Sequence, residues 1–307
     1  FFRENAAGIR ITDPHRNYRD HRPKPEMQVA LTDFWLLCGF RSVKEIRSAF
    51  LITPEFKVFA ESLGRHSAGS NSSSANQKIL KQLYRTILAM PQQQVSHILH
   101  RLHRRIVPLY REQRLSKESP DFWAARAFLS SSFDSTCDRG IFLIYLLNLI
   151  KLRTGQGVYL PAGIMHAYLE GVCVELMANS DNVLRGGLTR KHVDQHELLR
   201  VVRFKSGRPK LLRIHPLNSA EQRYSVPTSD FQLTLIRLKN GGVYEGRSNG
   251  AEILLSIESE MRTNTFVSDS RREFRSVKGS VFLLSDSARY RIKTAGPAEF
   301  FKAGLPS

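Results

Sequence analysis

The side chains best suited to chemistry flank a predicted turn at Glu170 and Gly171, which separate two apolar runs as the centre of a two-residue hairpin would. Pairing across this turn places His166 opposite Glu175, with Tyr168 on the same face. Cross-strand partners have Cβ atoms only ~5 Å apart. The pattern therefore brings an imidazole, a carboxylate and a phenol together among apolar neighbours.

Glu175 has apolar neighbours on both sides in the sequence, so its charge needs a partner or its pKa must rise. A metal ion bound by His166 beside an acid–base carboxylate, Glu175, would meet that need. Two structural alternatives stay open, a core histidine with satisfied hydrogen bonds and a buried ion pair. A register shift of one residue would separate the two side chains.

Two further places hold charged residues beside turns or strand ends. Arg185 precedes two glycines and Lys191 follows six residues later, so this loop offers a planar guanidinium and a point charge to an oxyanion or a phosphate. Lys24 precedes a proline and is held extended, while Glu26 opens a predicted strand. The alternatives are a surface loop with incidental charge and a solvated strand end.

The elements that would position these residues are mostly strands. The alternation at 27–31 predicts a half-buried strand with Met27, Val29 and Leu31 on its apolar face. Beyond residue 151, Gly, Pro and Asn turns separate short β-rich runs at 157–160, 167–169, 172–177, 231–238, 253–257 and 281–284. Short strands at this spacing are typical of a sandwich or barrel of jelly-roll type.

A helical segment interrupts the strands. Apolar residues recur at three- and four-residue spacing from Val95 to Ile106, with His and Arg side chains on the other faces. The run from Ile141 to Ile150 predicts a buried helix, because it is only half as long as a membrane span. The Ser- and Asn-rich stretch 64–77 indicates a surface loop or linker. We therefore expect a mainly β fold with an α-helical insertion.

Composition and charge limit the class of protein. The 307 residues are 41% hydrophobic and 24% charged, which excludes disordered, collagenous and membrane-spanning classes. Three cysteines without a C-x-x-C pair indicate neither a disulfide framework nor a thiolate zinc site, and favour a reduced, cytoplasmic setting. The 46 Lys and Arg against 28 Asp and Glu give a net charge of +18, which favours anionic partners, either a phosphorylated substrate or a nucleic acid.

Three stretches carry a resemblance to a known family. The longest runs from Pro161 to Lys191, and the others are Arg3 to Ile9 and Arg16 to Asp20, the last leading into Lys24-Pro25-Glu26-Met27. On these residues the chain resembles the type I phosphomannose isomerases, which are zinc enzymes built on cupin-type jelly-roll barrels. The final strands, through 279–282, are similar in pattern, whereas the helical segment and the linker before it match loosely.

The resemblance implies roles for individual residues. Glu26 and His166 become zinc ligands, Arg185 the catalytic arginine, and Glu175 an acid–base or positioning carboxylate. The residues expected to line the sugar-phosphate pocket are Lys24, Tyr168 and Lys191.

The family interconverts mannose 6-phosphate and fructose 6-phosphate, so the resemblance implies an aldose–ketose isomerase. Zinc would polarise the substrate, a carboxylate would move a proton between carbons 1 and 2 through an enediol, and arginine would stabilise an oxyanion or hold the phosphate. Which residue acts as the base stays open.

The chain departs from the family pattern near the expected site. It has Pro23 where the family usually has His, and Asp20-His21-Arg22 where the family has Asp-Pro-Asn. The family's other two zinc ligands come from a Gln-x-His motif upstream of the stretch that begins at Arg3. We therefore expect that this chain lacks an amino-terminal part, that two ligands lie upstream of residue 1, and that zinc binding and activity are weak without them. His15 and His21 could substitute.

The expected domains are the N-terminal part of a catalytic cupin barrel (1–63), a linker and helical domain (64–150), the barrel core (151–215) and a C-terminal cupin-like β domain (216–307). We expect a monomer that acts on a small sugar phosphate, with no membrane or nucleic-acid partner. The alternative function is a non-catalytic cupin that senses sugar phosphates or serves as a scaffold. A nucleic-acid binder rests only on the net charge and the basic helix at 95–106, and ranks last.

Overall fold

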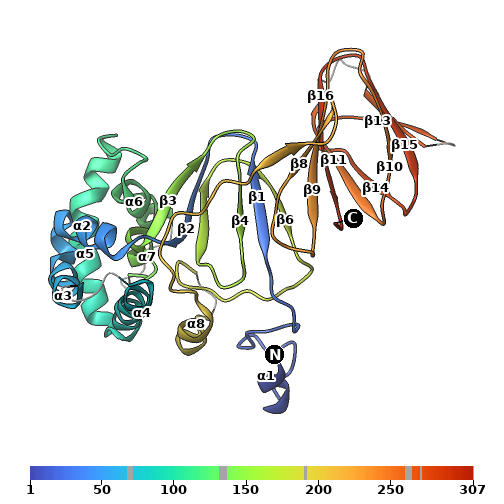
Figure 1. The fold of residues 1–307 in the computed structure, drawn as a ribbon. Coiled ribbons are helices and arrows are strands. Elements are labelled where there is room, and N and C mark those ends of the chain that lie inside the picture. Colours follow the sequence, from blue (N-terminus) through green and yellow to red (C-terminus); the bar gives the residue numbers. More distant parts are fainter. Residues whose placement is uncertain (68–71, 131–136, 190–191, 260–264, 270–271, 307) are drawn as a thin grey trace.

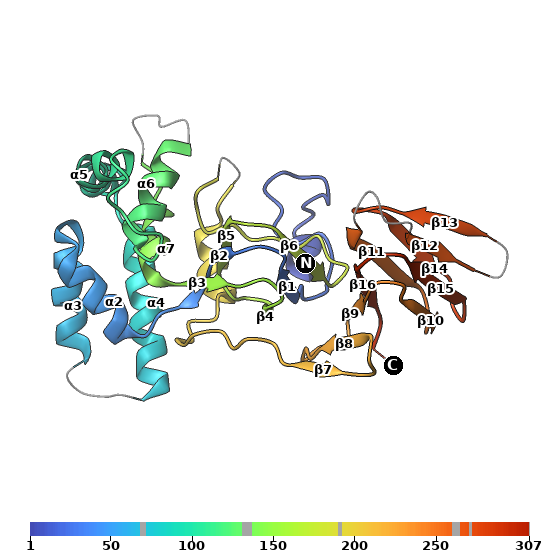
Figure 2. The same ribbon diagram turned by 90° about the horizontal axis from the view of Figure 1, so that it is seen from above.

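Three bodies lie in a row along the molecule, as Figures 1 and 2 show. The computed structural model describes residues 1–67, 72–130, 137–189, 192–259, 265–269 and 272–306. A helical domain stands at one end, a small β-barrel in the middle and a second β domain at the other end. The prediction of a mainly β fold with an α-helical insertion is confirmed.

The central barrel is made of two three-stranded sheets, with strand orders β4-β1-β6 and β3-β2-β5. Its strands are β1 (Glu26–Ala30), β2 (Phe34–Phe40), β3 (Leu147–Leu152), β4 (Gly157–Leu160), β5 (His166–Glu170) and β6 (Cys173–Met177). Every pairing within the two sheets is antiparallel. Because successive side chains of a strand point to opposite faces, each strand contributes to the barrel interior and to an outer contact.

Strand β1 uses both of its faces. Met27 and Val29 point outward and pack against Leu233 and Phe301 of the C-terminal β domain. Gln28 and Ala30 are buried as well, although the sequence predicted a half-buried strand. The reason is that Gln28 and Ala30 point into the barrel interior, while the C-terminal β domain covers Met27 and Val29.

The other sheet of the barrel packs on the helical domain. Leu36 and Cys38 of β2 lie in the barrel interior, whereas Trp35 and Leu37 belong to the core of the helical domain. The helices of that domain are α2 (Val43–Ile52), η1 (Pro54–Phe56), α3 (Lys57–Ser67), α4 (Ser73–Ala89), α5 (Gln92–Arg111), α6 (Pro120–Ser130) and α7 (Ile141–Leu146). The predicted amphipathic helix is α5, and its apolar stripe faces this core.

The helical region differs from expectation at its edges. Helices begin at Val43, where a Ser42–Glu45 capping box starts α2, and so precede the expected division at residue 64. The run 141–150 is helical only as far as Leu146, because the chain becomes extended at Leu147 and pairs with β2. The Ser- and Asn-rich stretch contains the end of α3 and the start of α4, and residues 68–71 lie outside the described part.

The C-terminal half begins with helix α8 (Gln195–Val201), which contacts α4. The C-terminal β domain then combines a six-stranded sheet, ordered β14-β11-β16-β9-β8-β7, with a four-stranded sheet, ordered β10-β15-β12-β13. These strands are β7 (Ile214–Pro216), β8 (Glu221–Tyr224), β9 (Gln232–Leu238), β10 (Val243–Arg247), β11 (Glu252–Ser259), β12 (Thr265–Ser268), β13 (Glu273–Ser276), β14 (Val281–Leu284), β15 (Arg289–Thr294) and β16 (Ala298–Gly304). The described helices include none that combines the length and the apolar character needed to cross a membrane.

Candidate active site

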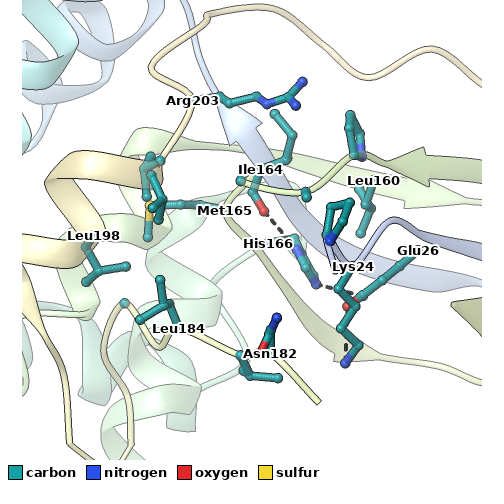
Figure 3. A pocket seen from close by; sticks show the side chains of 18 of the residues that line it. Lys24, Glu26, Leu160, Ile164, Met165, His166, Asn182, Leu184, Leu198 and Arg203 are labelled. Carbon is teal, nitrogen blue, oxygen red and sulfur yellow. Dashed lines mark hydrogen bonds and ion pairs between the residues drawn. The ribbon is translucent and has the colours of Figure 1, made fainter. Parts of the chain in front are cut away.

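Glu26 and His166 meet inside the barrel, at the start of β1 and of β5 (Figure 3). Nε2 of His166 lies 3.3 Å from Oε2 of Glu26, and Nζ of Lys24 lies 3.6 Å from the other carboxylate oxygen. On the far side of the imidazole, Nδ1 lies 3.0 Å from the carbonyl oxygen of Ile164. Because a carbonyl only accepts, Nδ1 carries a proton, and Nε2 is the nitrogen that faces the carboxylate.

The two side chains favour each other's charged forms. Burial acts to raise the pKa of Glu26, but the hydrogen bond and charge of His166 and the charge of Lys24 outweigh it, so that the pKa is lowered. Burial acts to lower the pKa of His166, but its bonds to Glu26 and to the Ile164 carbonyl prevail and raise it. The pair is therefore an ion pair in the absence of another cation.

Tyr168 joins this pair to Glu175. Its hydroxyl lies 2.5 Å from Oε1 of Glu175 and 3.3 Å from Oε2 of Glu26. Nε2 of Gln28 donates to the Tyr168 hydroxyl and, at 3.0 Å, to Glu175. Burial, then the hydrogen bond to Glu175 and the nearby carboxylate charges, raises the pKa of Tyr168 well above its usual value. Tyr168 therefore keeps its proton and acts as a donor.

The predicted hairpin is wrong, although the side chains it was meant to join do meet. Strand β5 pairs with β2 and β6 pairs with β1, so the two strands lie in different sheets and the segment around Gly171 connects the sheets. His166, Tyr168 and Glu175 converge because both strands direct alternate residues into the same barrel. Glu175 is exposed rather than buried among apolar side chains, so its charge needs less compensation than the sequence suggested.

A pocket of about 650 Å³ opens beside Glu26 and His166. Four cationic side chains line it, from Arg22, Lys24, Arg185 and Arg203. Within the described part of the chain, neither Arg185 nor Arg203 forms an ion pair with an acidic side chain. Unpaired guanidinium groups in a concave site favour an anionic ligand.

Tight glycine contacts hold the loop that carries Arg185. A Cβ atom on Gly187 would lie 2.6 Å from Cα of Gly140, and one on Gly186 would lie 2.5 Å from Cε of Met165. Gly187 also has φ near +147°, which side-chain-bearing residues rarely adopt. The glycines that follow Arg185 therefore let its loop approach the start of α7 closely.

A hydrogen-bonded clamp joins this loop to the N-terminal wall of the pocket. Oδ1 of Asn182 accepts from the backbone N–H of Arg19 at 2.7 Å, while its Nδ2 donates to the carbonyls of Asp20 at 2.9 Å and Arg22 at 3.0 Å. The Asp20 carboxylate in turn accepts from the Ser180 hydroxyl at 3.0 Å. The clamp fixes the segment leading to Lys24 against the segment leading to Arg185.

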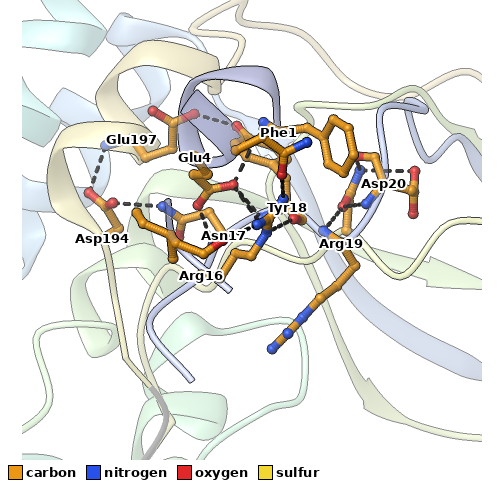
Figure 4. Close-up of polar contacts among 12 residues, drawn as sticks. Phe1, Glu4, Arg16, Asn17, Tyr18, Arg19, Asp20, Asp194 and Glu197 are labelled. Atoms are coloured by element: carbon orange, nitrogen blue, oxygen red, sulfur yellow. Dashed lines mark hydrogen bonds and ion pairs between the residues drawn. The ribbon is translucent and has the colours of Figure 1, made fainter. Parts of the chain in front are cut away.

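The N-terminal segment is also tied to α8, as Figure 4 shows. Tyr18 donates to Glu197, and Nδ2 of Asn17 donates to Asp194 at 2.8 Å. Arg16 is almost fully buried, at 6% exposure, and bonds to Asn5, Ile9 and the Tyr18 carbonyl, while Glu4 accepts from two backbone N–H groups of the same segment. Tyr18 therefore reaches the pocket wall from a well-anchored segment.

The structure brings most of the expected site residues together. Lys24, Glu26, His166 and Arg185 line the pocket, and Tyr168 and Glu175 join it through Glu26. Lys191 lies outside the described residues. The site residues that sequence reasoning missed are Arg22, Gln28, Asn182 and Arg203. Gln28 had a usable signal, because residues i and i+2 of a strand share a face and Glu26 was already a candidate.

A metal ion would find two suitable ligands here, the carboxylate of Glu26 and Nε2 of His166. Among the described residues, no group of three or more His, Cys, Asp or Glu side chains is placed to hold a metal. The two histidines considered as substitutes make other contacts. The rings of His15 and His192 meet edge to face with centroids 4.9 Å apart, and the ring of His21 lies 6.2 Å from that of Phe1.

A barrel pocket that combines a Glu–His pair with four cationic side chains is of the class suited to small anionic ligands. Residues 3–43 match the family model described as phosphomannose isomerase type I, catalytic domain. The chain is 30% identical over 309 residues to the mannose-6-phosphate isomerase of Rattus norvegicus, covering 96% of this chain and 70% of the relative. The chain belongs to the type I mannose-6-phosphate isomerase family.

Comparison with bacterial relatives and their crystal structures supports the same family. The Salmonella typhimurium mannose-6-phosphate isomerase is 35% identical over 262 residues, covering 85% of this chain. The chain spans 62% of the length of that relative and of the Escherichia coli one. The crystal structure of the Salmonella enzyme bound to fructose 6-phosphate and zinc superposes with a TM-score of 0.79 at 27% identity, covering 100% of this chain and 72% of the other.

Proposed function

We propose that this chain carries an active site that interconverts mannose 6-phosphate and fructose 6-phosphate through an enediol. The observation that carries the proposal is the Glu26–His166 pair at the wall of a pocket lined by four cations. The relatives named above are mannose-6-phosphate isomerases, and one was crystallised with fructose 6-phosphate.

The phosphate has a natural place in this pocket. Arg185 and Arg203 have no acidic partner among the described residues, so their donors are available to a phosphate dianion without breaking an existing ion pair. Lys24 is paired with Glu26, and it would donate a hydrogen bond to an oxygen of the sugar. Arg185 would act as the catalytic arginine if an oxyanion forms within its reach.

Glu26 and His166 would hold a zinc ion, whose chemistry when bound is to polarise a substrate oxygen as a Lewis acid. The fit rests on the donor types and on the Ile164 carbonyl, which keeps the proton on Nδ1 and turns Nε2 toward the site. Two protein ligands hold zinc poorly, so we propose that further ligands come from residues other than those described.

Glu175 is the candidate for moving the proton between carbons 1 and 2. Tyr168 and Gln28 both donate to this carboxylate, so they hold it oriented, and Tyr168 keeps its own proton. Glu175 therefore has the accepting capacity that a base requires, and Tyr168 and Gln28 act as positioning residues.

The test is isomerase turnover and zinc content of the protein that carries this sequence. His166→Ala should abolish both, while His97→Ala, which removes an exposed imidazole from α5, should change neither. Both variants should keep the wild-type circular dichroism spectrum. Wild-type turnover and stoichiometric zinc in the folded His166→Ala protein would refute the proposal.

A non-catalytic sugar-phosphate binder is the second candidate, favoured by the lack of a third metal ligand among the described residues. Stoichiometric zinc in the native protein supports the isomerase. Fructose 6-phosphate binding without zinc and without turnover supports the binder.

We further propose a cytoplasmic monomer. The three cysteines are free, and Cys38 and Cys137 are buried, which suits a reducing compartment. Light scattering of the purified protein measures the oligomeric state.

A further inference from the structure

A second basic hollow lies outside the active site, between α4 and α8. It has a volume of about 470 Å³, and the side chains of Lys81, Arg85, His196 and Arg200 line it. A neighbouring hollow of about 430 Å³ continues it along α4 past Lys78 and shares Lys81 and Arg85. No acidic residue lines either hollow in the described part of the chain. We call the two hollows together the α4–α8 groove.

Most of the positive charge in the α4–α8 groove is not neutralised by the protein. Nη1 of Arg85 donates to the neutral Oε1 of Gln82 at 3.2 Å, and Nζ of Lys81 lies 5.9 Å from the ring centre of Phe204. No carboxylate of the described residues forms an ion pair with either of them. Lys81 is half-buried, so its charge is less well solvated than that of a surface lysine. An anion would gain from binding between these side chains.

Helix α8 separates the groove from the active-site pocket. Its residues Leu198 and Val201 line the pocket, while His196 and Arg200 line the groove. Figure 3 shows Leu198 reaching the pocket from this helix. Any change in the position of α8 therefore reaches both sites.

One side chain of α8 links the two sites by direct bonds. Glu197 accepts from the guanidinium of Arg200, with Nε at 2.7 Å, and it also accepts from the Tyr18 hydroxyl (Figure 4). Tyr18 lines the active-site pocket, and Arg200 lines the groove. Glu197 takes Nε and Nη2 of Arg200, so an anion bound through the remaining donors shares this guanidinium with Glu197. Sharing the guanidinium weakens its bonds to Glu197 and changes how Glu197 holds Tyr18.

We propose that the α4–α8 groove is a regulatory site for a small phosphorylated molecule and that Arg200, Glu197 and Tyr18 couple it to the active-site pocket. Its volume suits a ligand about the size of a sugar phosphate, and a phosphate dianion matches its three permanent cations. The groove binds its ligand whether or not the pocket is an isomerase site, so the two proposals are tested separately.

The first test is calorimetric titration of the 307-residue chain with pyrophosphate at low ionic strength. The wild-type chain should bind two equivalents, one in the pocket and one in the groove. Lys81→Gln with Arg85→Gln should weaken the groove site about tenfold or more, because two of its cations are lost. Arg185→Ala should weaken only the pocket site.

The matched control is Arg101→Gln with Arg104→Gln, which removes the same charge from the exposed face of α5. This control should still bind two equivalents. The proposal is overturned if the Lys81/Arg85 double variant keeps both equivalents, or if the control loses binding to the same extent. Unchanged circular dichroism shows that each variant is folded.

The second test measures coupling. Because pyrophosphate also competes for the pocket, the coupling is measured as the groove-dependent shift: the change in the affinity for fructose 6-phosphate that pyrophosphate causes in the wild-type chain beyond the change it causes in Lys81→Gln with Arg85→Gln. This groove-dependent shift should be about fivefold in the wild type. Glu197→Gln keeps the size of the side chain and removes the charge that holds Arg200, so the shift should vanish. A shift that survives Glu197→Gln refutes the assigned route, and no shift in the wild type refutes the regulatory role.

Discussion

Asn182→Ala tests whether the clamp between the two pocket walls is as strong as its geometry implies. Asn182 uses both of its side-chain atoms: Oδ1 accepts from the N–H groups of Arg19 at 2.7 Å and Asp20 at 3.3 Å, and Nδ2 donates to Asp20 and to the Arg22 carbonyl. Alanine removes all of these bonds and leaves the two N–H groups to water.

The magnitude follows from the number of good bonds. Three of the five are 3.0 Å or shorter, and a net hydrogen bond contributes about 0.5–1.5 kcal/mol. Because Asn182 is half-buried, part of this loss is recovered by solvation. We expect a local cost of about 2 kcal/mol, which corresponds to faster exchange of the affected amides by a factor of about 30.

The assay is amide hydrogen exchange of the native chain followed by NMR. The N–H groups of Arg19 and Asp20 should exchange about 30-fold faster in Asn182→Ala, while the amides of α5 keep their wild-type rates. Asn218→Ala is the matched control, because Asn218 also accepts from two backbone N–H groups, in a turn of the C-terminal β domain. Wild-type exchange of Arg19 and Asp20 in Asn182→Ala would refute the reasoning.

Two further predictions concern Gly171, whose backbone has a positive φ, and Glu252, whose carboxyl group is buried. Gly171→Ala should lower the free energy of unfolding in urea by about 3 kcal/mol, because Gly171 has φ +111° and a Cβ would meet the Asp33 carbonyl. Gly155 also has a positive φ, but a Cβ there would meet no other atom, so Gly155→Ala should lower the free energy of unfolding by less. Glu252 is 7% exposed and its Oε2 has no hydrogen-bond partner among the described residues, so burial raises its pKa. A carboxyl whose folded pKa is raised keeps a proton that the unfolded chain has lost, so stability falls as pH rises above about 4.3. Glu252→Gln should remove this fall, and equal pH slopes in both proteins would contradict the assignment.

The sequence was most informative where a periodic pattern of apolar residues fits only one type of secondary structure. The amphipathic stripe from Val95 to Ile106 and strands β4, β5, β6, β9, β11 and β14 were predicted, because helical and alternating periodicities are local properties of the chain. The sequence analysis did not predict β7, β8, β10, β12, β13, β15 and β16. The run 141–150 was predicted wrongly beyond Leu146, because an apolar run interrupted only by Asn148 fits a buried helix and a buried strand equally well. Pairing with β2 decides that Leu147 onward is a strand.

For the site as well, residue types could be predicted from the local sequence, whereas the contacts between distant segments could not. Glu26, His166 and Arg185 were predicted from residue types and a family resemblance, and all three line one pocket. The turn at Gly171 was located, yet its strands were assigned to one hairpin, since sequence does not say which neighbours a strand will choose. Arg203 was missed because only the folded chain brings the segment after α8 to the pocket.

The two faces of β1 make the pocket depend on a distant domain. Met27 and Val29 rest against Phe301 and its neighbours, while Glu26 on the same strand faces His166. Loss of the contact with Phe301 would let β1 shift and would move the Glu26 carboxylate away from His166. A substitution of Phe301, in a domain that contributes no described residue to the pocket lining, would therefore alter the pocket at Glu26 before it unfolds the protein.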